Sequence, residues 1–478
     1  MKNLRKDVII SVGLFATCLA IYMSNGVAMP GGDLVASRYI PLSLLCEHDL
    51  DLNEMPLRIR QPNGKISQPY FLLPGKKRPG KIRSQVATLG PLPGIMAFPV
   101  FFVANLFSHR FSYHRVLSLA KLSAAILIAL SVLLLYLTLI PLTGRFGAAT
   151  LAMVYGVATS AWSMMSQALW QHTAALPWLI AALLMLTRGR KHKNLIPWAG
   201  MFLGLAVIAR PSNIVIAFAF TAYVWLHHRK DFPAFIGLAA IPAFLQMAYN
   251  QFYFGSPFLF GQTVLNQFLH THRKIMSSWA CPNCASWDTS PKHVIIAFFG
   301  LLISPSRGLF VFSPILLLGL WGLAASTRKN GDPLLRWSLI GFLGVVLLHA
   351  FRHDWWGGWS FGYRFTMDTV PLIVLGMTPL WPKIKTGRIL QGLASIMLVF
   401  SLIVQVLGAF SYNLVGWNAH PDINSHPQRL WSVTDSQIVY YLKNLKIRHD
   451  YHGYDTPPAT ITVCPVRIVN PQKEDGKH

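Results

Sequence analysis

The stretch SLAKLSAAILIALSVLLLYLTLI, residues 118–140, decides the fold class of this chain. It is almost entirely apolar and reaches the roughly 20 residues that a helix needs to cross a bilayer. Similar apolar runs occur at residues 308–326 and 389–410. We therefore predict an all-α polytopic membrane protein with about 11 to 13 spanning helices.

The composition agrees with a body embedded in lipid. Of the 478 residues, 53% are hydrophobic and 12% are charged, whereas soluble domains carry about 25% charged residues. The net charge of +25 sits largely in short loops between apolar segments, where the positive-inside rule places basic residues. No module of basic and aromatic residues accompanies this charge, so we expect membrane lipids and no nucleic acid as partners.

The basic loops also predict the topology of the chain. We place them in the cytoplasm at residues 188–193, 227–230, 327–329 and 383–388. The loops around residues 210–213, 250–307 and 353–364 and the tail then lie outside. Four apolar segments precede residue 188, at 91–107, 118–140, 147–162 and 172–187. Because an odd number of crossings is required, one of the four must be re-entrant, interfacial or merged with a neighbour.

The two ends of the chain complete this prediction. Lys2, Arg5 and Lys6 precede the first apolar run, as in a cleaved signal peptide or an uncleaved first helix. Since many spans follow, we expect an uncleaved helix with a cytoplasmic amino end, in the inner (cytoplasmic) membrane. We predict a transmembrane domain over residues 1–410, with interfacial helices in the first outer loop (30–90), and a small polar extracytoplasmic extension over 411–478. We expect the extension to pack on the outer loops, with a short helix near 435–446.

Acidic residues are concentrated directly after the first apolar segment. Five of the 17 lie in GGDLVASRYIPLSLLCEHDLDLNE, residues 31–54, and none lies between residues 55 and 230. They are Asp33, Glu47, Asp49, Asp51 and Glu54. An ionisable group at a membrane interface is costly unless it is solvated or used, so the cluster is a candidate active site.

Asp33 is the member of this cluster that we favour as a general base. A carboxylate in a partly desolvated site suits the removal of a proton from an acceptor hydroxyl. The alternative is that Asp33 caps an amphipathic interfacial helix over residues 34–46. Arg38 and Tyr39 follow on that helix and join the predicted catalytic set. Glu54 is the other acid expected to reach a substrate, although a solvated turn explains this part of the cluster equally well.

Three arginines lie at predicted outer helix ends: Arg210 in ARPSN, Arg307 in SPSRG and Arg364 in FGYRF. Snorkelling explains any one of them. A guanidinium also binds phosphate bidentately, so we predict a phosphate role for at least one, Arg364 first.

Neutral donors open the apolar helix in LWQHTAALPW. Gln171 and His172 suit sugar hydroxyls or a phosphate oxygen, or are structural hydrogen-bonding groups. The stretch HDWWGGWSFGYRFTMD, residues 353–368, forms an aromatic interfacial belt or a wall for a sugar or an isoprenoid chain. Within it we assign Trp356 and Asp354 to the donor site.

The cysteines leave several pairings open. Cys281 and Cys284 form CPNC and follow His270 and His272. These four are weak candidates for zinc, and a short-range disulfide in CPNC is the alternative. Cys18 lies inside the first span, and Cys46 with Cys464 is a further candidate pair. We therefore predict no firm metal site.

These signatures resemble the GT-C superfamily of integral-membrane glycosyltransferases, which holds protein mannosyltransferases, the aminoarabinose transferase of lipid A and oligosaccharyltransferases. The resemblance rests on GGD, LGPLPGIMAFPVFF, LWQH, ARPSN, YFGSPF, SPSRGLFVFSP and WWGGWSFGYRF, in this order. It is strongest to a bacterial subgroup with the patterns GGD, LWQH and WWGGWSFGxR.

The resemblance implies a reaction at the outer membrane face. A polyprenyl-phosphate sugar is the donor, the first-loop Asp, here Asp33, is the base, and an envelope lipid, glycan or protein is the acceptor. Some family members carry a second acidic motif that binds metal, but here that region is LWQH. A divalent cation, Mg²⁺ or Mn²⁺, therefore stays an open alternative, with Asp33 and Asp354 or Glu54 as its ligands.

Two other functions are weighed against the enzyme. A transporter or lipid-linked-sugar flippase tends to show repeat symmetry and polar groups in the middle of the membrane, whereas this chain places its charges at one face. An inactive binding subunit would keep the same fold.

Overall fold

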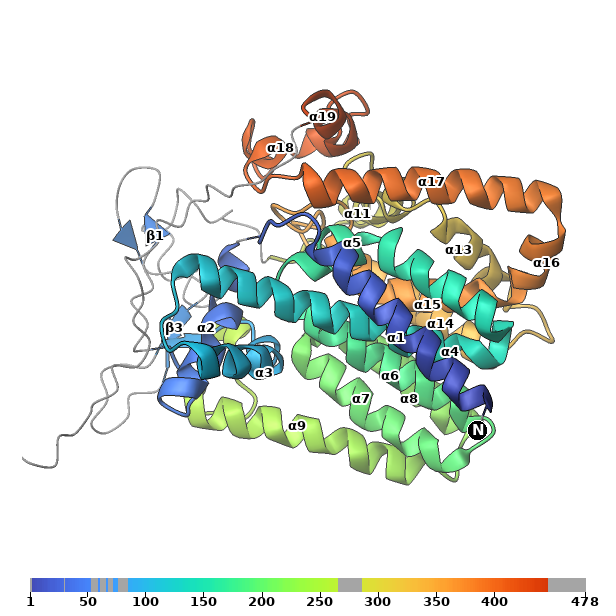
Figure 1. Cartoon of the computed structure of the whole chain (residues 1–478), viewed down its shortest axis with the longest axis horizontal. Helices are drawn as coiled ribbons and strands as arrows, with labels where there is room; N and C mark the ends of the chain where they lie inside the picture. The colour runs from blue at the N-terminus through green and yellow to red at the C-terminus, as the bar shows by residue number, and fades with distance from the viewer. Residues whose placement is uncertain are drawn as a thin grey trace, which may run out of the picture.

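The computed structural model describes residues 2–29, 31–52, 59–60, 66–67, 72–75, 85–264 and 286–445. These residues are mostly helical, and the long helices lie side by side in one bundle (Figure 1). The predicted all-α class is confirmed.

The elements are named along the chain as in Figure 1. The longer helices are α1 (Lys2–Met23), α2 (Val35–Cys46), α3 (Leu92–Phe107), α4 (Tyr113–Val157), α6 (Gln171–Gly189), α7 (Ile196–Ala209), α8 (Ile214–His227), α9 (Phe232–Phe254), α11 (Pro291–Ile303), α13 (Leu316–Ala325), α14 (Pro333–Ala350) and α17 (Arg388–Phe410). Short helices are α5 (Ser160–Ser163), α12 (Leu309–Phe312), α15 (Val370–Gly376), α16 (Trp381–Thr386), α18 (Gly416–Ala419) and α19 (Gln437–Lys443).

Short 3₁₀ helices and strands complete the fold. The 3₁₀ helices are η1 (Gly32–Leu34), η2 (Met165–Gln167), η3 (Lys193–Leu195), η4 (Pro211–Asn213), η5 (Arg364–Thr369), η6 (Thr378–Leu380) and η7 (Pro427–Trp431). Two antiparallel pairs are formed by β1 (Ile59–Arg60) with β2 (Ile66–Ser67) and by β3 (Leu72–Pro74) with β4 (Gln85–Ala87).

Five helices among the described residues are long and apolar enough to span a membrane, namely α1, α4, α9, α14 and α17. A sixth span results if residues 160–167 and α6, bent by 119° at their junction, are counted together. Shorter apolar helices include α2, α3, α11 and α13. The chain is therefore a multi-pass membrane protein, and the total of about 11 to 13 spans stays a prediction.

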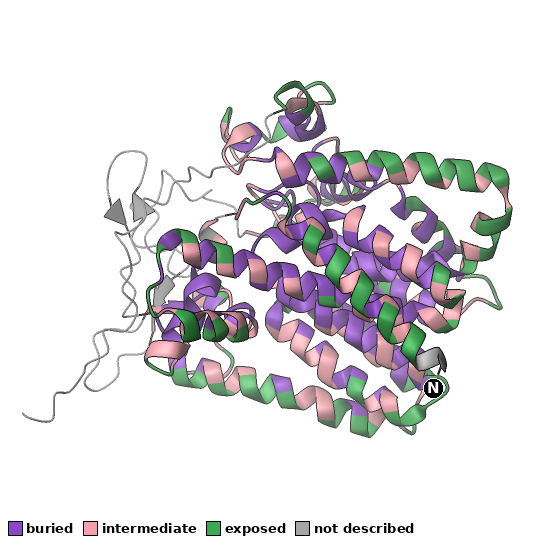
Figure 2. Ribbon diagram, in the orientation of Figure 1, coloured by how far each residue is buried: buried purple, intermediate pink, exposed green. Residues whose placement is uncertain are grey.

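The surface of the bundle is apolar where the helices face outward. Figure 2 shows exposed residues along α1, α9 and α17 around a buried interior. On α17, Ile389, Ile396 and Val399 are 91%, 71% and 55% exposed. An apolar surface of this extent is unfavourable in water and suits contact with lipid.

Helix α4 consists of two arms that fold back on each other. Gly144 interrupts it with φ 73° and ψ 174°, a conformation almost confined to glycine. The hydroxyl oxygens of Ser131 and Tyr155 lie 2.9 Å apart, although 24 residues of straight helix would separate them by about 36 Å. The segments at 118–140 and 147–162 therefore include the two arms of a hairpin.

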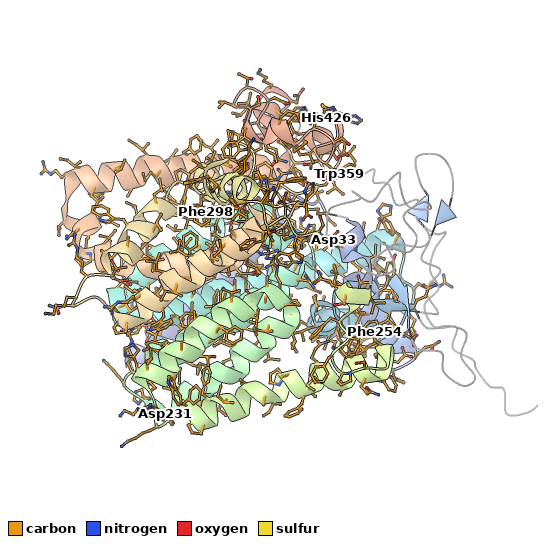
Figure 3. All side chains as sticks on the ribbon, turned by 180° about the vertical axis from the view of Figure 1, so that it is seen from behind. Asp33, Asp231, Phe254, Phe298, Trp359 and His426 are labelled. Atoms are coloured by element: carbon orange, nitrogen blue, oxygen red, sulfur yellow. The ribbon has the colours of Figure 1, made fainter. Side chains whose placement is uncertain are left out.

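The remaining segment in question is α3, which packs on α2. Ala97 and Phe101 of α3 share a small core with Ile40 of α2 and with Val116 and Ala120 in the first turns of α4. We call the end of the bundle that holds Asp33 the outer end; Figure 3 places Asp231 at the opposite end. We infer that α3 stays at the outer end, so that the two arms of α4 and α6 supply the odd number of crossings.

Helix α2 forms over the predicted residues, but α3 and α4 cover it. Residues 35–43 are buried, so the helix is enclosed on more sides than an amphipathic pattern suggests. The predicted short helix of the extension is also confirmed, as α19 (Gln437–Lys443). The division into a domain over 1–410 and an extension over 411–478 stays a prediction.

We expect Gly144→Ala to destabilise the protein by about 1 to 3 kcal/mol, because an L residue is strained in this backbone conformation. Thermal unfolding in detergent measures the effect. Gly392→Ala in α17 is the matched control, since a Cβ at either position meets nothing within 4 Å and alanine favours a helix. Equal stability of the two variants would contradict a strained reversal at Gly144.

Candidate active site

An ion pair joins the first outer loop to the tryptophan-rich stretch, residues 353–368. Arg364 Nη2 donates to Asp33 Oδ2 over 2.5 Å, and the two residues are 331 positions apart in the chain. Their side chains are 15% and 29% exposed, so solvent reaches the pair. Leu34 occupies the N-cap of α2, without a side-chain capping bond. Asp33 therefore pairs with a cation and does not cap this helix.

The turn that carries Asp33 is held by Arg38 from inside. The Arg38 side chain is 2% exposed and donates from Nη2 to Gly31 O over 2.7 Å and from Nε to Leu34 O over 3.2 Å. Tyr39 is also buried. This arrangement suits a positioning role for Arg38. The predicted Glu54 lies outside the described residues.

A second, buried cluster of charged and polar side chains surrounds Asp368, which lies four residues after Arg364 in η5. Asp368 accepts from Arg210 Nη1 over 2.8 Å and lies 3.2 Å from His172 Nδ1. Arg210 Nη2 is 3.4 Å from His349 Nε2. Burial raises the pKa of Asp368, but the adjacent His172 and Arg210 outweigh it and hold this pKa below its ordinary value. Asp368 therefore stays ionised and anchors η5.

The ring of Phe365 connects these charged groups. The His349 ring stacks on it at 4.6 Å between centroids, and the guanidinium groups of Arg352 and Arg210 lie 5.1 Å and 5.9 Å from its centre. Arg352 in turn pairs with Asp354 at 2.8 Å. Burial raises the pKa of Asp354, and Arg352 partly offsets this effect. Two acid–arginine pairs thus meet at one aromatic ring beside Arg364.

The LWQH motif lines the same region. The Arg364 guanidinium lies over the Trp170 ring, 4.2 Å from its centre, a favourable cation–π geometry. Gln171 Nε2 donates to Leu89 O over 2.5 Å. His172, on the next residue of α6, reaches Asp368. The structure therefore brings Arg364, Arg210 and His172 together near Asp33.

Arg307 and Trp356 are placed differently. Arg307 is 1% exposed, and its guanidinium donates to Trp356 O, Gly358 O and Asn418 Oδ1. Trp356 Nε1 donates to Asn424 Oδ1 over 3.2 Å. Both residues therefore bind protein groups next to the C-terminal extension, away from the Asp33 ion pair.

The weak candidates for zinc, His270, His272, Cys281 and Cys284, lie outside the described residues. Cys464, the candidate disulfide partner of Cys46, lies outside them as well. Within the described part of the chain, no group of three His, Cys, Asp or Glu residues is arranged to hold a metal ion. Cys18 is buried in α1, and Cys46 is disulfide-bonded.

Three residues of the site were missed by the sequence analysis: Asp368, His349 and Arg352. Asp368 had a detectable signal, since it lies four residues after Arg364 in a chain with few acids. His349 lies in the last turn of α14, and Arg352 follows this helix. Nothing in their local sequence distinguishes them from groups at an ordinary helix end.

No family model matches the chain, and no curated protein matches it. A solved structure of the oligosaccharyltransferase of Archaeoglobus fulgidus, in complex with zinc and sulfate, matches with a TM-score of 0.50 and 14% identity over 88% of this chain. The chain has the GT-C fold.

Two other solved structures are similar over most of the chain. The apo form of the same oligosaccharyltransferase matches 89% of it with a TM-score of 0.48 and 14% identity. ArnT from Cupriavidus metallidurans, bound to undecaprenyl phosphate, matches 90% with a TM-score of 0.47 and 12% identity. This chain spans 74% of the ArnT chain and 57% and 60% of the two oligosaccharyltransferase chains.

We expect Asp368→Asn to destabilise the protein by about 3 to 5 kcal/mol, because it leaves buried Arg210 without its counter-charge. Thermal unfolding in detergent measures the loss. Asp332→Asn is the control: it breaks a part-exposed pair with Arg190 and keeps a good N-cap for α14. Its effect should stay below about 1 kcal/mol. A loss for Asp368→Asn no greater than that of the control would contradict an anchoring role.

Proposed function

We propose that this chain is a membrane glycosyltransferase, which moves a sugar from a polyprenyl-phosphate donor to an envelope lipid, glycan or protein acceptor. The observation that carries the proposal is the solvent-accessible ion pair between Asp33 and Arg364. The GT-C fold supports the reaction class, and the sequence resemblance supports the type of donor. A carboxylate and a guanidinium in contact supply the two groups that this reaction needs.

Asp33 acts as the general base in this proposal. Its carboxylate takes the proton of the acceptor hydroxyl while the acceptor oxygen attacks the anomeric carbon of the donor sugar. The bond between that carbon and the phosphate oxygen breaks, and its electron pair stays on the lipid phosphate. Arg38 keeps the Asp33 turn in place through Gly31 O and Leu34 O. Tyr39 packs beneath the same turn, in the α2 core.

Arg364 takes the charge of the leaving phosphate. A positioned cation stabilises negative charge that develops in the transition state, so no acid is needed to protonate the leaving group. Arg364 is paired with Asp33 before substrate binds. When Asp33 accepts a proton its charge disappears, and Arg364 becomes free to pair with the phosphate. Proton removal and departure of the lipid phosphate are therefore coupled through one salt bridge.

The remaining residues of the site support these two. Asp368, held by His172 and Arg210, anchors the 3₁₀ helix that begins with Arg364. Gln171 fixes the start of α6 through Leu89 O. We rank Arg210 behind Arg364 as the phosphate ligand, since its side chain is only 7% exposed and is paired with Asp368.

A divalent cation does not fit the carboxylates near Arg364. Asp33 and Asp354, two of the ligands considered for Mg²⁺ or Mn²⁺, each contact an arginine within 3.0 Å. Such a cation needs several oxygen ligands without a competing guanidinium. The mechanism above accordingly uses only groups of the protein.

We expect Asp33→Asn to lower sugar transfer by about 10²- to 10⁴-fold, because the amide cannot accept the proton. Consumption of polyprenyl-phosphate-linked sugar in membranes, followed by mass spectrometry, measures this loss. Asp7→Asn is the matched control, since Asp7 pairs with Arg145 over the same 2.5 Å in a different part of the bundle. Full turnover by Asp33→Asn would refute the role of Asp33 as base.

The coupling predicts opposite effects on binding of the product. Asp33→Asn should bind undecaprenyl phosphate about tenfold more tightly, because Arg364 no longer has a competing carboxylate, and Arg364→Gln should bind it about tenfold more weakly. Binding to the purified protein in detergent is measured with undecaprenyl phosphate itself. Arg190→Gln should leave the affinity unchanged. Weaker binding by Asp33→Asn would contradict the exchange of partners.

A further inference from the structure

The described part of the C-terminal extension, residues 411–445, bonds directly to the segment that leads into Arg364. We propose that Arg307, Asn418 and Gln437, which we call the clamp, position Arg364 for its work on the lipid phosphate. This inference rests on the proposed function and adds to it a role for the extension. Figure 1 shows α18 and α19 of the extension beside the end of α17.

Gln437 provides the clearest contact. Its side chain is fully buried and bonds with both of its ends to the segment before Arg364. Oε1 accepts from Gly362 N over 3.0 Å, and Nε2 donates to Ser360 O over 2.9 Å. Nε2 also lies 3.3 Å from Asn418 Oδ1. One amide therefore fixes a donor and an acceptor of the backbone two residues apart.

Arg307 holds the earlier part of the same segment. Nε donates to Trp356 O over 3.0 Å, and Nη2 donates to Gly358 O over 3.1 Å and to Asn418 Oδ1 over 2.9 Å. Asn418 Oδ1 is thus shared by Arg307 and Gln437, which makes the three side chains one network. The hydrogen bonds of this network engage the Arg307 guanidinium, which the sequence had suggested as a phosphate ligand.

The backbone of this segment needs such partners. Gly357, Gly358 and Gly362 have φ of 75°, 67° and 62°, so the chain turns repeatedly and forms neither a helix nor a strand here. Buried backbone carbonyl groups that lack the regular hydrogen bonds of a helix or a sheet must accept hydrogen bonds from other groups. The clamp supplies these bonds, and it thereby selects the conformation of the segment.

The path from the clamp to the reacting groups is short. Arg364 N donates to Gly362 O over 3.1 Å, and Gly362 N is bonded to Gln437. A displacement of Gly362 therefore moves the start of η5 and the Arg364 guanidinium with it. Because that guanidinium is 2.5 Å from Asp33, a small displacement disturbs the pair.

The extension also contacts the tryptophans of the segment. Trp359 Nε1 donates to Asp422 Oδ1 over 3.0 Å, and Trp356 Nε1 donates to Asn424 Oδ1 over 3.2 Å. Figure 3 places Asp33, Trp359 and His426 toward the same end of the bundle. Two further side chains of the extension thus bind the segment independently of the clamp.

A double-mutant cycle tests the inference in the full-length protein. Gln437→Leu should weaken binding of undecaprenyl phosphate about tenfold when Arg364 is present, because the loss of both bonds displaces Gly362. In an Arg364→Gln background the same substitution should have no further effect, since the residue through which it acts is gone. Trp359→Phe, a milder change that keeps an aromatic ring and removes the bond to Asp422, should show a smaller loss with the same dependence on Arg364.

Tyr441→Phe is the matched control. Tyr441 is buried in the extension and bonds to the backbone of Asn413, but its hydroxyl does not bond to residues 355–362. It should keep normal affinity for undecaprenyl phosphate, while thermal unfolding reports any general loss of stability.

The failures of the two proposals are distinguishable. An equal loss of affinity in Tyr441→Phe, or a loss in Gln437→Leu that persists in the Arg364→Gln background, would overturn the positioning role alone. Unchanged affinity in Arg364→Gln itself would overturn the proposed function, and the inference with it.

Discussion

The outer end of the bundle depends on three pairs of an acid with an arginine. Asp33 with Arg364, Asp368 with Arg210, and Asp354 with Arg352 form three pairs around the residues that open η5. An uncompensated charge in a poorly solvated site is strongly unfavourable, so each partner fixes the position of the other. Asp33 and Arg364 are 331 positions apart in the chain, and Asp368 and Arg210 are 158 positions apart. These two pairs therefore join the first loop and the end of α7 to η5, whereas Arg352 and Asp354 are only two positions apart.

This balance of charge limits what the site can bind. The three carboxylates around η5 are matched by three guanidinium groups. In the proposed reaction, a phosphate that binds one of these three arginines displaces its carboxylate. The pair with the most exposed acid, Asp33, is the one where this displacement is least costly. The requirement ties phosphate binding to the protonation state of Asp33. In the proposed reaction, this single salt bridge thus orders the two events.

Local sequence patterns were sufficient for the membrane class and for the helices at α2 and α19. They also assigned Asp33 and Arg364 to loops on the same side, although they did not predict the contact between the two. They were insufficient for the partners of the other cations. Arg210, Arg307 and Arg364 look alike in sequence because each adjoins an apolar span. Only tertiary contacts separate a guanidinium that holds backbone carbonyls, such as Arg307, from one paired with an accessible carboxylate. Asp368 was missed for the same reason, because its partners lie in α6 and after α7.

The contrast between two sets of ion pairs favours an enzyme over a transporter. Asp7 with Arg145 and Asp332 with Arg190 are pairs in which every side chain is between 23% and 36% exposed. The pairs around η5 include the fully buried Asp368 and meet at the ring of Phe365. Burial of several charges in one place is unfavourable, and functional sites are where proteins most often retain it. A flippase would need charged groups along a path through the bundle, whereas here the buried acid–arginine pairs gather around η5. This asymmetry therefore agrees with the proposed reaction site at one end of the bundle.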